Sequence, residues 1–241
     1  MNNASLEERT VIIAGAAGGL GSVATAAFAK SGAKLALLGR DQGKLDELAA
    51  ELNLPAARTL AKAVDLGRPQ EVDRVANDLL EKFGGIDILL NFVGGWIGGK
   101  GVFETKREEL VSMLDQHLYA GYAMIKSFVP TMVKNHWGRV LAVTSPSASR
   151  PPGNNAPYAI GKSAMEALML SLAQELRGTG VTSNLLMVRM IDVAHERQIN
   201  PSEKNQSWTT PEEISATLLH LCSEEAGMIN GARIPLYGEP Y

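Results

Sequence analysis

Short runs of aliphatic and β-branched residues alternate along this chain with longer stretches in which apolar residues recur every three or four positions. The short runs have the length of buried strands, and the longer stretches have the periodicity of helices with one buried stripe. Runs such as VIIAG and DILLN are apolar throughout, which is typical of parallel strands covered on both faces. Seven strands are predicted, at residues 10–14, 34–38, 58–64, 86–90, 139–144, 181–187 and 233–236.

The alternation of strand and helix predicts βαβ crossovers. We therefore expect an α/β fold, a Rossmann-type doubly wound sheet of seven mainly parallel strands with helices on both faces. No Pro/Ser-rich linker and no internal repeat divides the sequence, so residues 1–241 are predicted to form a single Rossmann-fold domain. Within it, the polar stretch 193–209 is predicted to be a short substrate lid.

Composition excludes several classes of protein. The chain has 241 residues, a net charge of −3 and one cysteine, Cys222, so a disulfide scaffold is excluded and a reducing, cytoplasmic location is expected. No CxxC pair or His/Cys cluster predicts a metal site. No basic block favours nucleic acid, and neither a leader nor an apolar run of roughly 18–20 residues predicts a membrane partner.

Glycine is enriched, at 24 residues in 241, which is about one in ten against a usual ~7%. Directly after the first predicted strand the sequence reads AGAAGGLG and then continues into an Ala-rich helix. A pyrophosphate at a helix N-terminus needs close approach to backbone N–H groups, which a Cβ would prevent. A tight turn without a ligand is the alternative. The candidate pyrophosphate-binding residues are Gly15, Gly18, Gly19, Leu20 and Gly21.

The end of the second strand carries the residues that would meet an adenosine ribose. Arg40 there could pair with a 2′-phosphate, which favours NADP over NAD, although stacking on adenine is also compatible with an arginine. The neighbouring Asp41 is equally suited to capping the next helix. The third and fourth strands end at the same edge, where ligands bind in open α/β sheets. Their candidate cofactor contacts are Asp65, Leu66, Asn91, Val93 and Gly94.

Tyr158 and Lys162 lie four residues apart and therefore on one face of a predicted helix. A cation beside a phenol favours the phenolate and would lower its pKa, which makes the pair a plausible acid–base unit. A solvated Tyr/Lys pair is the common alternative. Ser145 ends the fifth predicted strand, so its hydroxyl is placed to reach the same crevice, although a serine before Pro146 is also compatible with a turn.

Taken together, these motifs give the chain a resemblance to the short-chain dehydrogenase/reductase family over nearly its whole length. The family resemblance implies that Tyr158 exchanges the carbonyl or alcohol proton, that Ser145 polarises the same oxygen, and that Lys162 binds the nicotinamide ribose and tunes Tyr158. The matching positions are Gly15, Gly19 and Gly21 in the glycine turn, Asp65, Asn91 and Gly94 at the sheet edge, and Ser145, Tyr158 and Lys162 in the catalytic set.

The chain departs from the family pattern at several positions, of which two bear on the site. His117 occupies the place of a helix asparagine that normally steadies a proton-carrying water; a histidine there could act as a pH-sensitive relay or be a buried space-filling residue. Val188-Arg189 replaces a Pro-Gly pair after the sixth strand. Carboxamide contacts are then expected from backbone, near Ile191.

Substrate contacts are expected from the glycine-rich segment 94–101, where Trp96 is either a gate over the site or packed against the body, and from Ser147. His195 and Arg197, in the expected lid, are either solvated or placed to meet an anionic substrate. The long helical patterns at residues 108–133 and 156–177 are apolar on more than one side, and the family resemblance implies that they pair subunits into a homotetramer or homodimer.

These features predict an NAD(P)(H)-dependent oxidoreductase, with NADP preferred and NAD possible as cofactor, acting on a small-molecule carbonyl or alcohol. His117 would join Ser145, Tyr158 and Lys162 as a fourth candidate catalytic residue. The alternative function is an NADP-binding regulatory or scaffold protein of the same fold with little turnover.

Overall fold

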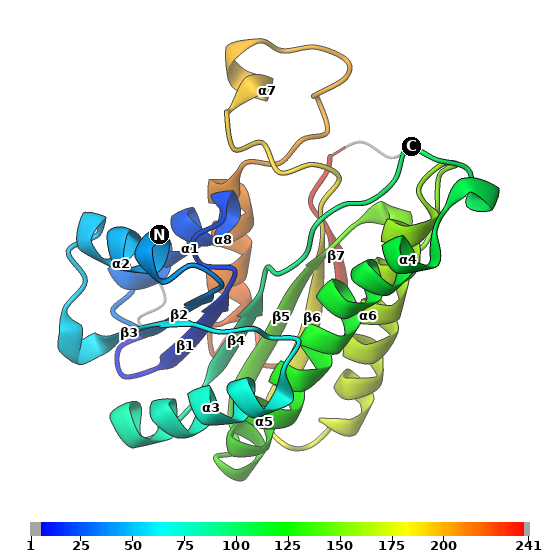
Figure 1. Ribbon diagram of the computed structural model, residues 1–241. Helices are drawn as coiled ribbons and strands as arrows, with labels where there is room; N and C mark the ends of the chain where they lie inside the picture. The colour runs from blue at the N-terminus through cyan, green and yellow to red at the C-terminus, as the bar shows by residue number, and fades with distance from the viewer. Residues whose placement is uncertain (1–5, 239–241) are drawn as a thin grey trace.

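A seven-stranded sheet forms the centre of the computed structural model, which describes residues 6–238 (Figure 1). Every strand is parallel to its neighbours, and the order across the sheet is β3-β2-β1-β4-β5-β6-β7. The sequence predicted a mainly parallel sheet, and the sheet is parallel throughout. The strands are β1 (Thr10–Ala14), β2 (Lys34–Gly39), β3 (Thr59–Ala63), β4 (Ile88–Asn91), β5 (Gly138–Thr144), β6 (Val181–Met187) and β7 (Arg233–Pro235).

The predicted strands differ from the observed ones mainly at their ends. Strand β4 begins two residues later than predicted and includes Asn91. The two outer strands, β3 and β7, are only partly buried, whereas β1, β4 and β6 are buried along their whole length. The expectation of strands apolar on both faces therefore holds for the middle of the sheet and fails at its edges, where one side has no neighbouring strand.

Helices cover both faces of the sheet (Figure 1). On one face Phe28, Leu45 and Leu218 pack against the strands; on the other face Val75, Phe128 and Met165 do so. The first layer contains α1 (Gly19–Lys30), α2 (Gln42–Glu51) and α8 (Pro211–Leu221), and the second contains α3 (Pro69–Phe83), α5 (Ala120–Lys134) and α6 (Ala156–Glu175), with α4 (Arg107–Leu114) against α6. Short helices lie in the connections: η1 (Ala56–Arg58), η2 (Val102–Glu104), η4 (Pro146–Ala148) and α7 (Glu196–Ile199).

The predicted helix at residues 108–133 is not regular. A π-helical segment, η3 (Asp115–Tyr119), separates α4 from α5. A π turn inserts one extra residue per turn and is frequent at functional sites. Here it places His117 in the interior.

The segment 193–209, expected as a lid, contains α7 and projects from the body of the molecule (Figure 1). Its base is fixed: the buried Asp192 accepts hydrogen bonds from the backbone N–H groups of Glu196 and Arg197, and His195 pairs with Glu212 of α8. His195 and Arg197 are thus engaged in contacts within the protein. Within the part of the chain that the structure describes, no helix is both long and apolar enough to cross a membrane.

Candidate active site

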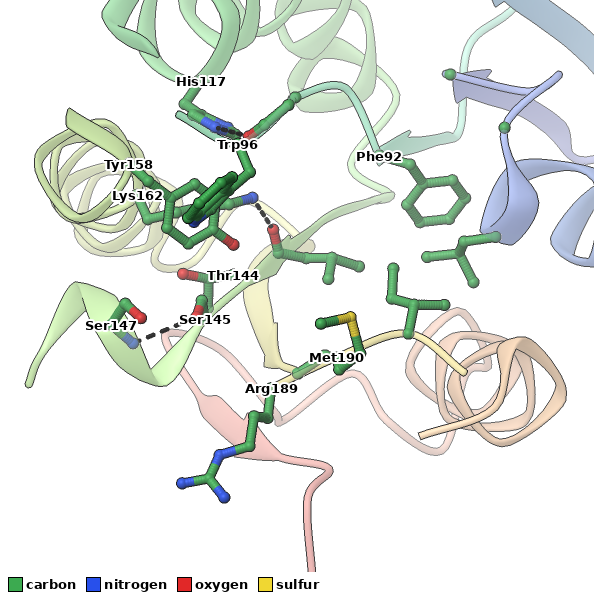
Figure 2. Close-up of a pocket in the computed structure, with 18 of the residues that line it drawn as sticks. Phe92, Trp96, His117, Thr144, Ser145, Ser147, Tyr158, Lys162, Arg189 and Met190 are labelled. Carbon is green, nitrogen blue, oxygen red and sulfur yellow. Dashed lines mark hydrogen bonds between the residues drawn. The ribbon is translucent and has the colours of Figure 1, made fainter. Parts of the chain in front are cut away.

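A cavity of about 740 Å³ opens at the carboxyl edge of the strands. It lies where the strand order reverses, between β1 and β4, which is the position of ligand sites in doubly wound sheets. Glycines of the turn after β1 form one end, and the predicted catalytic side chains form the other (Figure 2). Its walls include Gly15, Gly18, Gly19, Leu20, Gly21, Phe92, Gly94, Trp96, His117, Ser145, Ser147, Tyr158, Lys162, Arg189, Met190 and Ile191.

Each of the four glycines of the turn is required for a different structural reason, except Gly18, whose position has room for a side chain. Gly15 has a φ of +87°, which side chains rarely tolerate, and a Cβ on Gly21 would overlap the Gly15 carbonyl oxygen. A Cβ on Gly19 would lie 2.7 Å from Val193 Cγ2, whereas one on Gly18 would meet only the Gly15 carbonyl, at 3.3 Å. Gly18, the N-cap of α1, has no side chain that could accept a hydrogen bond from the first N–H groups of the helix, and the start of α1 lines the cavity. This end of the cavity fits a pyrophosphate.

The residues predicted for the adenosine end lie at the carboxyl edge but outside the cavity walls. Arg40 and Asp65 are exposed, and Asp65 forms an ion pair with Arg68 at 3.2 Å. Leu66 is buried. Asp41 caps α2 by accepting a hydrogen bond from the Lys44 backbone N–H, in agreement with the capping interpretation.

Two further predicted contacts, Asn91 and Val93, form a turn after β4. The buried Asn91 side chain accepts a hydrogen bond from the Val93 backbone N–H at 3.0 Å, so it fixes the local backbone. Val93 packs against the core and does not line the cavity. Gly94, with a φ of +148°, does line it.

Ser145, Tyr158 and Lys162 come together as predicted (Figure 2). Ser145 follows β5 and accepts a hydrogen bond from the Ser147 backbone N–H at 3.2 Å. Lys162, one turn after Tyr158 on α6, places its Nζ 5.9 Å from the Tyr158 ring centroid and donates a hydrogen bond to the Val143 carbonyl at 2.8 Å. The strand end and the helix therefore bring the three groups to one point.

The protonation of this group differs from the expectation. Burial raises the pKa of Tyr158, and the hydrogen bond with Ser145 acts in the opposite direction without reversing it. Burial also lowers the pKa of Lys162 to about 8. The predicted lowering of the phenol pKa by the lysine is therefore absent in this structure, because the ammonium lies against the Val143 carbonyl and the phenol is largely buried.

His117 is buried, and its ring packs edge-on against Tyr158 with the centroids 5.6 Å apart. Its Nε2 lies 3.0 Å from the Gly95 carbonyl, which can only accept, so Nε2 carries the proton. Desolvation and the charge of Lys162 lower the His117 pKa to about 4. The imidazole ring is therefore neutral at neutral pH, which disfavours a relay that titrates near pH 6.5. The ring fits here because Gly94 and Gly161 have no Cβ atoms, which would otherwise overlap it.

Trp96 lines the same cavity as Tyr158, and in the view of Figure 2 its indole is drawn in front of the Tyr158 ring. Its Nε1 donates a hydrogen bond to Asn155 Oδ1 at 2.9 Å, and the Gly99 backbone N–H donates to the Asn154 carbonyl at 2.7 Å. The glycine-rich segment is thus attached to the start of α6. Although the Trp96 ring borders the cavity, 62% of the residue is exposed, so it is not packed into the body.

The remaining wall is formed by the chain after β6. Ile191 borders the cavity as predicted, together with Arg189 and Met190, whereas residues 194–209 do not. The Arg189 side chain points away from Tyr158 in Figure 2 and donates a hydrogen bond to Ser207 at 3.1 Å. The segment predicted as a lid therefore leaves the site open.

The sequence did not single out Asn155, which anchors Trp96, nor Val143, whose carbonyl holds Lys162. A backbone acceptor has no side-chain signal, so Val143 could not have been found by residue type. Asn155 directly precedes a helix whose first turn contains Pro157, and that position alone suggests a cap. The structure shows no side-chain capping bond from Asn155, because its amide oxygen is used by Trp96.

Comparisons with known proteins agree with this geometry. The family model described as short chain dehydrogenase matches residues 9–204. An uncharacterized oxidoreductase of Staphylococcus epidermidis is 28% identical over 78% of this chain and 80% of its own length, and one of Staphylococcus aureus is 25% identical over 91% and 93%. The crystal structure of a short chain dehydrogenase from Bacillus anthracis superposes with a TM-score of 0.87 at 26% identity, covering 97% of this chain and 96% of the other.

The family match spans well over half of the chain, and the sheet order, the glycine turn and the meeting of Ser145, Tyr158 and Lys162 agree with it. Members of this family use NAD(P), for which the glycine turn has a fitting cradle. The chain belongs to the short-chain dehydrogenase/reductase family of oxidoreductases.

Proposed function

We propose that this protein transfers hydride between NADP(H) and a small carbonyl or alcohol substrate, with Tyr158 as the acid–base group. The observation that carries the proposal is the arrangement of the cavity. A glycine cradle suited to a pyrophosphate lies at one end, and Ser145, Tyr158 and Lys162 lie at the other. When bound, the nicotinamide supplies or accepts the hydride.

Ser145 and Tyr158 act on the substrate oxygen. Both hydroxyls lie at the same end of the cavity, so we expect an oxygen entering there to be within reach of both. Donation from Ser145 polarises a carbonyl, and Tyr158 delivers the proton as the oxygen becomes an alkoxide. Because burial raises the pKa of Tyr158, the phenol is protonated at neutral pH, which suits the reductive direction.

Lys162 is proposed to hold the cofactor. It has a pKa of about 8, so its ammonium is largely charged at pH 7. The same ammonium is placed to donate to the nicotinamide ribose. Its Val143 hydrogen bond fixes the direction of the side chain.

The cofactor is proposed to be NADP, because Arg40 directly follows β2 as an exposed cation, where a 2′-phosphate is expected to lie. Arg40→Ala is expected to weaken NADPH binding about tenfold, the value of one charge-assisted hydrogen bond, and to leave NADH binding nearly unchanged. Fluorescence titration with both nucleotides measures this. Equal losses for the two would contradict the assignment.

The substrate is proposed to be small or medium in size with an apolar face. Trp96 and Met190 are both exposed large apolar side chains bordering the cavity, and Phe92 lies nearer the glycine turn. Ser147, which also lines the cavity, is the polar side chain predicted to contact the substrate beside Ser145 and Tyr158. The open mouth left by the projecting segment 193–209 permits a range of shapes.

A homodimer or homotetramer is proposed from the helix faces opposite the core. Exposed apolar side chains gather on α4, η3, α5 and α6: Val111, Tyr119, Tyr122 and Ile160. Such a surface favours a protein partner over water. The mass of the full chain in solution tests this, and a monomer would contradict it.

Turnover of a panel of aldehydes and ketones with NADPH or NADH tests the activity. We expect cofactor oxidation by at least one carbonyl class, and a loss of about 10²–10⁴-fold in Tyr158→Phe, because the proton donor is removed. Tyr122→Phe, a matched change on the exposed side of α5, is expected to behave as wild type. Binding of NADPH without oxidation across the panel would favour the regulatory or scaffold alternative.

A further inference from the structure

A buried carboxylate lies next to the catalytic group but outside the cavity walls. Glu166 is only 2% exposed and follows Lys162 by one turn of α6. Both of its oxygens are engaged: Oε1 accepts a hydrogen bond from Thr144 Oγ1 at 2.7 Å, and Oε2 pairs with Arg233 Nε at 2.8 Å. Charged side chains are seldom buried without such partners.

The partners of Glu166 come from two different strands. Thr144 is the last residue of β5 and directly precedes Ser145, while the carbonyl of the residue before it, Val143, holds Lys162. Arg233 belongs to β7, the outermost strand, and lies beside Leu185 of β6. Glu166 thus connects the helix that carries Tyr158 and Lys162 with the strand that directly precedes Ser145.

Glu166 also acts on Lys162 through its charge. Burial disfavours the ammonium and brings the pKa of Lys162 down to about 8, and the Glu166 carboxylate acts in the opposite direction. Arg233 is paired with the same carboxylate, and a second cation at this place is expected to oppose the effect of Glu166 on Lys162. Neither Glu166 nor Arg233 lines the cavity.

Few other charged groups face this region. Beside Lys162 are Tyr158 on α6 and the neutral His117 on η3. Strand β6 carries no ionisable side chain, and the only one on β5, Arg139, is bonded to carbonyls at its far end. The ionisable residues of α4 and η3 other than His117 are exposed or half-buried: Arg107, Glu108, Glu109, Asp115 and Tyr119.

We propose that Glu166 is a positioning residue for the proposed reaction. It connects α6 to β5 through Thr144, and its carboxylate keeps Lys162 in the ammonium form. Arg233 weakens the effect of the Glu166 charge on Lys162. The role of Glu166 in catalysis rests on the proposed function. The charge relation itself is a property of the protein without cofactor or substrate. It predicts opposite effects when the two members of the pair are removed.

The test follows the ¹³Cε resonance of Lys162 against pH in the full chain without cofactor, assigned with Lys162→Arg. Glu166→Gln is expected to lower the Lys162 midpoint by about one pH unit, the smaller end of what an adjacent opposite charge contributes. Arg233→Gln is expected to raise it, because the carboxylate then acts on Lys162 without a competing cation. Glu175→Gln, an exposed change at the end of the same helix, is expected to leave it unchanged.

Unchanged midpoints, or shifts of the same sign in both variants, would overturn the role of Glu166. Arg233 is 45% exposed in its side chain, so Arg233→Gln alone decides the question if the buried Glu166→Gln does not fold. Where turnover is measurable, the pH profile of kcat should move in the same direction as the midpoint. Opposite midpoint shifts in a protein without turnover would support the charge relation and contradict the proposed function alone.

Discussion

His117 shows how the environment of a single residue decides its chemistry. The sequence left open whether this histidine is a titrating relay or a buried space-filling residue. The structure favours the second, because the ring is enclosed between Gly94 and Gly161, bonded to the Gly95 carbonyl and desolvated beside Lys162. Residue type gives a histidine pKa near 6.5, whereas burial cannot be read from the residue type and moves it to about 4.

This difference makes stability depend on pH. The His117 pKa is lowered on folding, so the unfolded chain binds more protons between pH 6.5 and about 4. The stabilisation is fully present above pH 6.5 and is lost as pH falls toward 4, by about 3 kcal/mol. Denaturant unfolding of wild type and His117→Asn at pH 7 and pH 4.5 measures it: the variant is expected to lose less stability on acidification. Equal losses would show that His117 does not titrate on unfolding.

The turn between β1 and α1 is the element that the sequence predicted best. A tight turn between a strand and a helix favours glycine for geometric reasons. The structure shows which of its glycines are required: Gly15 by its positive φ and Gly21 by its contact with the Gly15 carbonyl. Less could be predicted for the segment after β6. Its polar residues are compatible with a lid, but residues 194–209 do not line the cavity. The segment is held by hydrogen bonds from the Glu196 and Arg197 N–H groups to Asp192 and by the pair His195–Glu212. The second contact joins residues 17 positions apart, which no local pattern relates.

Two alanine substitutions separate folding from binding in this turn. Gly21→Ala would force its Cβ onto the Gly15 carbonyl oxygen, so we expect a loss of stability of about 1–3 kcal/mol from overpacking. A Cβ on Gly18 would meet only one atom, at 3.3 Å, so Gly18→Ala should fold. Gly18 lines the cavity, so we expect the added methyl group to hinder the pyrophosphate and weaken NADPH binding. Thermal unfolding and nucleotide titration of both variants measure this. Tight NADPH binding by Gly18→Ala would contradict the placement of the pyrophosphate.

At the scale of the whole molecule, the alternation of strands and helices was sufficient to predict the sheet and the edge at which its site lies. Ser145, Tyr158 and Lys162 could be predicted because strand ends and helix faces have fixed directions. The pair of Glu166 with Arg233 could not, since it depends on which strand lies at the outer edge of the sheet beside β6. The π-helical interruption at η3 was also missed, because the apolar pattern continues across it.

Transfer of deuterium from NADPH labelled at nicotinamide C4 to the carbonyl carbon of a substrate tests the proposed function most directly. With wild-type protein and a carbonyl that supports turnover, we expect the label on the alcohol carbon of the product, and about 10²–10⁴-fold slower labelling with Tyr158→Phe. Labelling at the wild-type rate in Tyr158→Phe would remove Tyr158 from the reaction. Bound NADPH that yields no labelled product with any carbonyl class would contradict hydride transfer by this protein.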